Sequence, residues 1–461
     1  MSAARLLLPA AAAPISADPR HPMPATSPTC FRGRLAALAL AGSGLLAPAA
    51  AQELSWSGFG TVGLAASNRD FTYQRFITRD ASLARDSVFG LQADVRLGPQ
   101  WSATLQLKLA PSLKSDARWD LVPAWGFLAW RPNDAWLLRA GRLRLPLYLH
   151  SEALDVGQAH DMARLPIEVY SVAPSYDING LFVTRSFTLG ERGDKDLSID
   201  AYHGAIDTTA RFWTRDGAPP QVPAGPQFRG VVVTTTGLAG TWRGNDLLLR
   251  ASVHRIETRQ RSGDALPVRF PFVPVAPGLG YYQVNNQIPG PGVPEVAAIR
   301  NTLMSLGGEY SFAGGWRVAG EYVRNRQQDT ELASDTRAAY VAVFKRLGKF
   351  TPYVSLSQLN SSAGSLDWYQ RLTANPLPAF IPGASQLNAA QRLSAESLWV
   401  ADQQSLALGS AYALSPQLKL KGEWQRSRIG QVSRLIDTLA GSPTPHDTTV
   451  DVWSLNLNFA F

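Results

Sequence analysis

The chain has 461 residues, with 44 lysines and arginines against 36 aspartates and glutamates, and it contains 38 glycines, 32 prolines, 13 tryptophans, 13 tyrosines and 18 phenylalanines. A soluble protein of this length would divide into two or three domains, but amphipathic helical repeats are scarce and period-2 segments recur throughout, which favours one large sheet. The only cysteine, Cys30, excludes an internal disulfide and a cysteine-based metal site, and nothing in the composition indicates a cofactor.

The N-terminal segment has the pattern of an export signal. Arg32 and Arg34 precede an apolar run from Leu35 to Leu46, and Ala49-Ala50-Ala51 offers a small-residue cleavage site. We therefore predict a signal peptide over residues 1–51.

Met23 is a candidate initiator, which would make residues 1–22 an extension of the gene model. The mature part, residues 52–461, keeps 40 basic and 35 acidic residues, a modest net charge of +5. No basic run interleaves with aromatic residues on one face, so nucleic acid is not an expected partner. Beyond the N-terminus no run of about 18 apolar residues occurs, so no transmembrane helix is expected.

Sixteen segments alternate apolar and polar residues over lengths near the 9–11 residues of a strand that crosses a membrane. They run approximately over residues 55–65, 87–97, 101–109, 121–131, 135–142, 178–189, 197–206, 230–242, 246–258, 300–312, 316–326, 338–347, 350–359, 403–414, 418–427 and 449–461. Connections after even-numbered segments are short and carry turn residues, whereas those after odd-numbered segments are longer. This predicts an all-β fold, a transmembrane antiparallel up-and-down β-barrel of about 16 strands with long outer loops; 14 or 18 strands remain open.

Five tryptophans stand beside the predicted short turns. Trp101, Trp136 and Trp316 begin strands just after such turns, and Trp130 and Trp242 end strands just before them. Their common height predicts an aromatic girdle at one membrane interface. The alternative is that they are core residues of separate soluble sheets.

The polar face of the strands predicts the lining of the lumen. A charge facing lipid costs about 2–4 kcal/mol for Arg or Lys at the midplane, so charged residues are expected to face water inside. The basic candidates are Arg96, Lys108, Arg139, Arg250, Arg317, Lys345, Lys419 and Lys421, and the acidic ones are Asp94, Asp200, Glu321 and Glu423. A polar interior indicates a water-filled channel and not a packed core.

The first predicted outer loop alternates arginines with aspartates. The arginines are Arg69, Arg75, Arg79 and Arg85, and the aspartates are Asp70, Asp80 and Asp86. They are candidates to bridge the phosphates of lipopolysaccharide, although an ordinary solvated loop explains the same pattern.

The loop of about residues 143–177 is the candidate constriction of the pore. Its candidate residues are Glu152, Asp155, Asp161, Arg164 and Glu168. Acidic side chains facing basic ones on the wall would give a transverse field that sorts solutes by charge and size. The alternative is a cluster that braces the loop. A metal site at His150, His160 and Asp161 is not expected, because nothing in the sequence holds these residues together.

The same region carries a family resemblance. The run Leu138-Arg139-Ala140-Gly141-Arg142 with Leu145-Pro146, then Ser151 to Gly157 (SEALDVG) and Arg164 to Tyr170 (RLPIEVY), resembles proteobacterial porins of the Gram-negative and phosphate-selective porin superfamily. The resemblance implies a 16-stranded, usually trimeric channel whose third loop narrows the pore. The motif covers about 50 residues, and the N-terminal coiled coil that some relatives carry is not present.

The final segment alternates strictly. Its apolar positions are Trp453, Leu455, Leu457, Phe459 and Phe461, and its other face carries Val452, Ser454, Asn456, Asn458 and Ala460. A strand that ends in an aromatic residue resembles the C-terminal strand of Gram-negative outer-membrane barrels, which implies that Phe461 is an assembly signal. The alternative is an edge strand of a soluble sandwich.

Together these patterns predict a passive diffusion channel in the outer membrane for small hydrophilic solutes and inorganic ions, with a weak anion preference. The expected partners are outer-membrane lipid, lipopolysaccharide and, from the resemblance, two further copies in a homotrimer. The leading alternative is an adhesin or structural barrel whose loops at 260–298 and 360–398 bind a partner. An enzyme is not expected, because Ser252 and His254 share a strand face without a nucleophile-elbow motif. A transport receptor would need a plug domain before the first strand.

Overall fold

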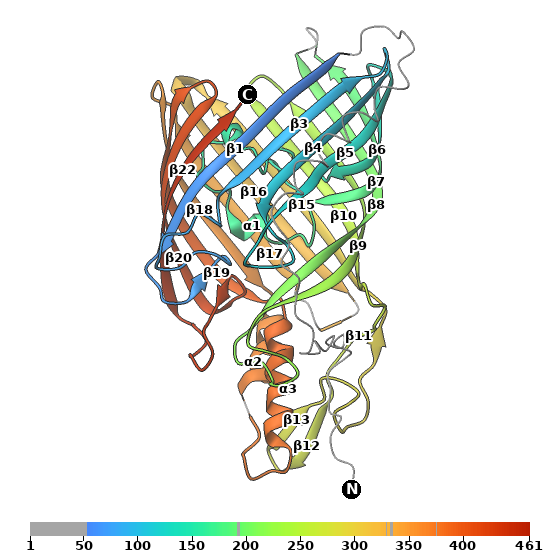
Figure 1. Cartoon of the computed structure of the whole chain (residues 1–461), viewed down its shortest axis with the longest axis vertical. Coiled ribbons are helices and arrows are strands. Elements are labelled where there is room, and N and C mark those ends of the chain that lie inside the picture. Colours follow the sequence, from blue (N-terminus) through green and yellow to red (C-terminus); the bar gives the residue numbers. More distant parts are fainter. Residues whose placement is uncertain (1–52, 191–193, 329, 332–334, 375) are drawn as a thin grey trace, which may run out of the picture.

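The computed structural model describes residues 53–190, 194–328, 330–331, 335–374 and 376–461, so the predicted signal peptide lies outside the described residues. Sixteen antiparallel strands, each hydrogen-bonded to its neighbours in chain order, form a closed barrel (Figure 1). They are β1 (Leu54–Ser67), β3 (Val88–Arg96), β4 (Trp101–Pro111), β5 (Trp119–Asn133), β6 (Trp136–Arg144), β7 (Asp177–Leu189), β8 (Lys195–Thr214), β9 (Gly225–Arg243), β10 (Leu247–Gln260), β15 (Ile299–Phe312), β16 (Trp316–Gln328), β17 (Thr336–Lys345), β18 (Phe350–Ser361), β19 (Ala401–Ser415), β20 (Leu418–Ser433) and β22 (Thr448–Ala460). The predicted sixteen-stranded, up-and-down barrel is confirmed.

Burial alternates along the strands as the sequence pattern requires. In β22 the side chains of Trp453 and Leu455 are more than half exposed, while Asn456 and Asn458 are buried. The apolar face therefore points out of the barrel and the polar face points into it, the arrangement of a barrel surrounded by lipid.

The barrel closes where the first strand meets the last. β1 pairs with β22 in a register that runs from Phe59 opposite Ala460 to Ser67 opposite Val452. Beyond this ladder, Phe461 exchanges two backbone hydrogen bonds of 2.9 Å with Gly58. The ring of Phe461 occupies the space where a β-carbon on Gly58 would stand, so an aromatic ring covers a glycine at the seam.

The connections on one side of the barrel are short. One of them is a single 3-10 turn, η2 (Ala313–Gly315), in which Gly314 has φ 74° and Gly315 has φ 82°, values that favour glycine. Trp101, Trp136 and Trp316 lie outward and exposed next to these turns, and Trp101 stacks on Trp130. The structure thus places the tryptophans on the outward face at one end of the barrel.

The long connections on the opposite side build additional structure. We call residues 266–296 and 363–400 the outer knob. It contains β11 (Leu266–Pro267), β12 (Phe272–Ala276), β13 (Leu279–Tyr282), β14 (Glu295–Val296), α2 (Ala363–Ala374) and α3 (Ala384–Ser397), and it projects beyond the barrel rim in Figure 1. A further pair, β2 (Thr72–Tyr73) and β21 (Ile436–Asp437), joins two other outer loops.

The outer knob has a hydrophobic core of its own. Phe270 stacks on Trp368, and Tyr282 packs edge-on against the same indole at 4.9 Å between ring centroids. Leu372 and Leu398 are buried in the same cluster. In the described part of the chain no helix is both long enough and apolar enough to span a membrane.

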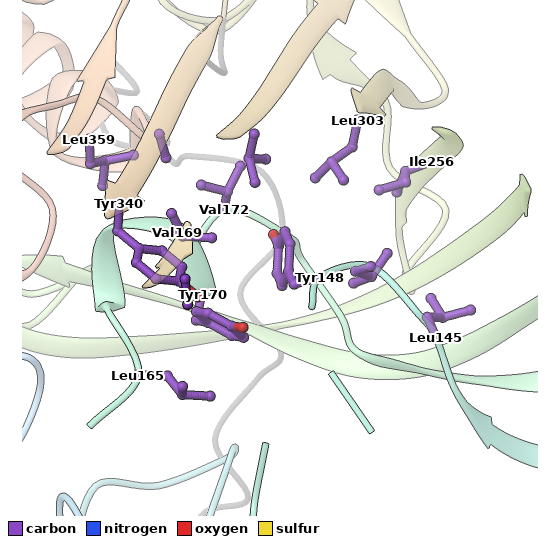
Figure 2. Close-up of a cluster of buried hydrophobic side chains, with 14 of the residues drawn as sticks. Leu145, Tyr148, Leu165, Val169, Tyr170, Val172, Ile256, Leu303, Tyr340 and Leu359 are labelled. Atoms are coloured by element: carbon purple, nitrogen blue, oxygen red, sulfur yellow. The ribbon is translucent and has the colours of Figure 1, made fainter. Parts of the chain in front are cut away.

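The interior of the barrel departs from the predicted water-filled lumen. Residues 145–176, here called the inserted loop, contain η1 (Gly157–Ala159) and α1 (Ile167–Tyr170) and lie inside the barrel. Apolar side chains of this loop pack on inward side chains of β7 to β19 (Figure 2). Leu147, Tyr148 and Val169 of the loop are fully buried there. The expectation of a polar interior without a packed core is therefore wrong for one half of the lumen, because the loop supplies the apolar partner that the wall needs.

Candidate functional site

The inserted loop is fixed to the wall by charge-assisted contacts that begin at Glu152. Arg250 on β10 is buried and grips both carboxylate oxygens of Glu152 at 2.7 and 2.8 Å. Its guanidinium also donates to the Tyr148 carbonyl at 2.7 Å and to Thr241 at 3.0 Å. A bidentate pair of this kind sets orientation as well as attraction.

Asp155 makes the second tie, on the other side of the loop. Its carboxylate accepts from Lys108 on β4 at 2.8 Å and from Arg144 at 2.9 Å, and Arg144 also pairs with Asp177 at 3.0 Å. Asp155 lies in the loop, outside the membrane-spanning strands. Burial raises the pKa of Asp155, but the two cations outweigh burial and hold that pKa well below its ordinary value. The carboxylate is therefore ionised at neutral pH.

Asp161 makes the third tie. Arg317 on β16 donates to it at 2.6 Å and Lys419 on β20 at 2.9 Å. Lys419 also donates to the carbonyl of Gln158 at 3.0 Å. Three acidic residues of the loop are thus each paired with wall cations that the sequence marked as pore-lining.

Arg164 and Glu168 tie the loop to the remaining wall. Arg164 donates to Asp86 at 3.1 Å and also contacts Ser454. Glu168 is fully buried and accepts from Ser357 at 2.9 Å and from Gln403 at 2.6 Å. All five predicted loop residues therefore bind the wall.

Lys421 holds the loop without a carboxylate. Its side chain is fully buried, and the ammonium donates to the carbonyls of Gly157 at 2.6 Å and Met162 at 2.9 Å. Backbone carbonyls of the loop act here as the acceptors of a buried charge.

The remaining basic candidates are placed differently. Arg96 is exposed at the lumen mouth and pairs with Glu53 at 3.2 Å. Arg139 faces inward, donates to Thr184 at 3.2 Å and lies over the ring of Phe182.

Lys345 departs from its predicted place in the lumen. It follows Phe344, which is buried on the inward face, so Lys345 points outward, and its ammonium lies 4.6 Å from the ring centroid of Trp316. It also donates to the Gly314 carbonyl at 2.7 Å. Lys345 therefore lies on the outward face of the barrel, beside the short turns.

The sequence predicted that Glu321 lines the lumen, but not which partners it contacts. Glu321 on β16 accepts from the Leu149 backbone at 2.7 Å, from the Tyr170 hydroxyl at 2.6 Å and from the Tyr340 hydroxyl at 3.0 Å. Arg144, at the very end of β6, was missed. The available signal was Tyr340, which lies on the otherwise apolar inward face of β17, because a buried hydroxyl needs a hydrogen-bond partner.

The contacts favour the interpretation that these residues form a cluster that braces the loop. Each acidic side chain of the loop touches its wall partner directly and does not face it across a gap, so the five residues brace the loop. On the opposite side of the lumen, polar residues remain on β3 and β4. Thr104 donates to Asp94 at 2.6 Å, and Gln106 donates to Gln92 at 2.7 Å. The side chains of Gln92, Asp94, Thr104 and Gln106 are here called the polar strip.

The histidines inside the barrel are also engaged in structural contacts. His160 Nδ1 lies 3.0 Å from the Met162 carbonyl and 3.3 Å from the Lys421 ammonium. No group of three or more metal-ligating side chains occurs among the described residues. His254 lies 2.7 Å from Ser252, but it is completely buried beneath the inserted loop.

The arginines of the first outer loop do not form one solvated row. Arg75 pairs with Asp116 at 2.6 Å, and Arg69 donates to the Thr449 carbonyl at 2.6 Å. Only the pair of Arg79 with Asp70, 3.0 Å long, is largely exposed among the ion pairs of these four arginines. The loop therefore folds onto the barrel mouth.

Comparison with known proteins rests on structure alone. No protein-family model matches the chain, and no curated protein matches it. Among solved structures, it is similar to a loop L8 deletion mutant of OmpT, an outer membrane protein of Vibrio cholerae, with a TM-score of 0.50 and 11% identity over 89% of this chain and 100% of that one. An anion-selective porin from Comamonas acidovorans matches with a TM-score of 0.49 and 11% identity, again over 89% and 100% of the two chains. The chain thus shares the closed-barrel fold of an outer membrane protein.

Proposed function

We propose that this protein is a non-enzymatic diffusion channel of the outer membrane, which passes small hydrophilic solutes and inorganic ions. The observation that carries the proposal is the closed barrel with an apolar outer face, whose lumen is half filled by a loop tied to the wall. Binding the loop on one side leaves the polar strip on the other side as a lining suited to water and ions.

The proposed route runs between the inserted loop and the strands β3 and β4. Polar inward groups there include Gln92, Asp94 and Thr104. The opposite half, from β7 to β19, is closed by the apolar cluster. A solute that keeps its hydration would follow the polar side, since burying a polar group without a partner is costly.

Conductance of the refolded mature chain in a planar bilayer under a salt gradient tests the function. Stepwise ohmic currents are the expected result. Folded protein that gives no current would overturn the channel and favour a barrel whose outer loops bind a partner.

Cysteine accessibility tests the route. The predicted mature chain has no cysteine, so single cysteines can be introduced cleanly. In Thr104→Cys we expect a charged, thiol-reactive reagent to reduce the current. In the matched variant Ala342→Cys, which is inward but fully buried against the apolar cluster, no change is expected. Equal reactivity at both positions would contradict the asymmetric lumen.

We further propose a weak anion preference. Its support is that the acidic residues of the inserted loop are neutralised by wall cations, whereas Arg139 has no carboxylate within ion-pair distance among the described residues. The reversal potential should lie on the anion side and move toward zero in Arg139→Gln. A cation-side potential in the native protein would assign selectivity to Glu152, Asp155 and Asp161 instead.

Four further proposals concern the export, the surroundings and the assembly of the protein. We propose export by a cleaved signal peptide, contact with lipopolysaccharide, assembly as a homotrimer, and recognition of Phe461 during insertion. Native mass spectrometry of the protein from outer membranes would report the mature N-terminus and the subunit number together.

The outer knob supports the one alternative function. The outer knob has a hydrophobic core separate from that of the lumen, so it is a folded unit and not an irregular loop. In this alternative, the barrel displays the outer knob to bind a partner, and the lumen is closed to solutes. The conductance measurement separates the two functions.

A further inference from the structure

A cavity of about 480 Å³ lies between the first outer loop, the inserted loop and the segment before β22. Five arginines line it: Arg75, Arg85, Arg164, Arg211 and Arg434. We call it the arginine cavity. It stands on the outer side of the inserted loop, against the same wall strands as the polar strip.

Three of these arginines are already paired with carboxylates. Arg75 and Arg211 share Asp116, Arg211 also binds Asp437 at 2.6 Å, and Arg164 binds Asp86. These pairs hold the three chain segments together and leave little attraction for a further anion.

Arg85 and Arg434 differ from the other three. Among the described residues, Arg85 donates only to the side chain of Gln74, at 3.3 Å, and Arg434 only to the backbone carbonyl of Glu396. Neither forms an ion pair with a carboxylate among the described residues. Two guanidinium groups at one cavity therefore have no carboxylate in direct contact, and the carboxylates of Asp86 and Asp437 act on them only from a longer distance.

Several buried donors at the same cavity lack a partner. Gln74 is 4% exposed, and its Nε2 makes no hydrogen bond among the described residues. The same holds for Nε of Arg434 and Nη1 of Arg164. Buried N–H groups are nearly always hydrogen-bonded, so this set is built to meet an acceptor.

The rest of the cavity wall is mixed: it holds the carboxylates Asp86, Asp155 and Asp437, each already paired with a cation, and an apolar side. Phe76, Leu154, Leu165, Ile167 and Leu435 line it beside the donors. An inorganic anion has oxygen on every side and would leave several of its oxygens against hydrocarbon. A molecule with one carboxylate and an apolar body matches both parts of the wall.

We infer that the arginine cavity is a binding subsite for small carboxylates with an apolar body, held by Arg85, Arg434 and Gln74. The inference rests on the proposed channel, since it names a class of solute that enters from the outer side. A carboxylate held by either guanidinium group would accept hydrogen bonds from donors that the protein leaves free.

Benzoate is the probe, with inorganic phosphate and benzamide as matched compounds. Titrating benzoate into the detergent-solubilised, folded protein and recording isothermal calorimetry should give saturable binding. The uncharged benzamide should bind at least about tenfold more weakly, the ratio expected when a charge-assisted hydrogen bond is lost. Phosphate should also bind more weakly than benzoate, because it has no apolar body to pack against the apolar side of the wall. In the bilayer, benzoate should reduce the chloride current with the same midpoint.

Arg85→Gln and Arg434→Gln should each weaken benzoate binding by about tenfold or more. Arg79→Gln is the control, because Arg79 lies in the same outer loop but pairs with Asp70 in solvent. Circular dichroism of each variant reports folding, and Gln74→Leu offers a second test if an arginine variant does not fold.

The outcomes separate the subsite from the channel. Benzoate binding without ohmic current would leave the subsite standing and remove the channel. Current without benzoate binding would overturn the subsite and keep the channel. Phosphate binding as tight as benzoate would overturn the assigned ligand class.

Discussion

At the scale of single residues, most charged side chains of this lumen serve to place the inserted loop. Arg250 illustrates this role, since it is buried and donates to Glu152, Tyr148 and Thr241 at once. Its removal leaves a carbonyl and a carboxylate with fewer donors.

We expect Arg250→Gln to lower the free energy of unfolding by about 1–3 kcal/mol, less than for a fully buried pair because Glu152 is half exposed. Current fluctuations should increase, because the loop loses its bidentate anchor. Urea unfolding followed by tryptophan fluorescence gives the first quantity and single-channel noise the second. Lys345→Gln, on the outward rim, is the control and should leave both unchanged.

Asp116 gives a prediction on pH. It lies in the outer connection between β4 and β5, and although burial raises its pKa, the hydrogen bonds and charges of Arg211 and Arg75 outweigh burial and lower that pKa below 3.8. A carboxyl with a lowered pKa stabilises the folded state above its unfolded pKa and loses that contribution as pH falls through the folded value.

Protection of the outer loops from acid-active protease should therefore fall below about pH 3.8 in the native protein. In Asp116→Asn the loops should already be less protected at pH 6, and the part of the pH dependence due to Asp116 should vanish. Asp437, the other partner of Arg211, acts in the opposite direction, because burial raises its pKa. Asp70→Asn is the exposed control, and a loss of protection equal to that in Asp116→Asn would contradict the prediction.

At the scale of elements, the inserted loop depends on close approach to the wall. A β-carbon on Gly157 would collide with Asn458 on β22 and would stand 2.7 Å from the hydroxyl oxygen of Thr61 on β1. Gly157 thus lets η1 lie directly against the closing seam of the barrel.

We expect Gly157→Ala to displace the start of η1 and to reduce stability by about 1–3 kcal/mol, the usual cost of overpacking. Because the loop narrows the proposed route, single-channel conductance should change as well. Gly98→Ala is a matched control, since a β-carbon at Gly98 meets nothing within 4 Å. An unchanged conductance in Gly157→Ala would show that the loop does not limit the current.

The outer knob should be separable from the barrel. The ends of β18 and β19 lie side by side, with the Ala401 amide donating to the Ser361 hydroxyl at 3.0 Å, so a short turn can replace residues 363–399. Without α2 and α3, the segment 266–296 loses the packing of Trp368 on Phe270 and should become sensitive to protease. The barrel should still fold and conduct. Failure of the truncated chain to fold would show that the knob supports the barrel.

At the scale of the whole molecule, the sequence predicted the barrel well and its interior only in part. The lipid phase imposes apolar residues on the outward face, which is every second position along a strand, so the approximate strand number, the turns and the tryptophan positions could be predicted. The inward face follows no such rule. The inward face of β17 is apolar because it packs on the inserted loop. Polarity therefore could not show which face of β17 points into the barrel, and Lys345 was predicted on the inward face although it lies on the outward face.

The same cause explains the segment Ile178 to Leu189, which carries apolar residues on both faces at several positions, a pattern that would also suit a subunit contact. Ile178 and Phe182 are buried toward the inserted loop, while Leu181 is exposed on the outside. A subunit contact is not needed to account for that pattern. The contacts of the loop could not be predicted, because they join residues such as Gln158 and Lys419 that are 261 positions apart.

The ladder between β1 and β22 has a consequence for how the molecule is made. Its paired residues, such as Gly60 and Phe459, stand at opposite ends of the described chain, so this seam can form only after every other strand is in place. Until then the growing sheet has two free edges, which are templates for pairing with other chains. The apolar face of the inserted loop also has no complete surface to bury against before closure. The folding polypeptide should therefore need protection from aggregation until its last strand arrives, and a variant that weakens the seam should be lost during biogenesis before any change in transport is seen.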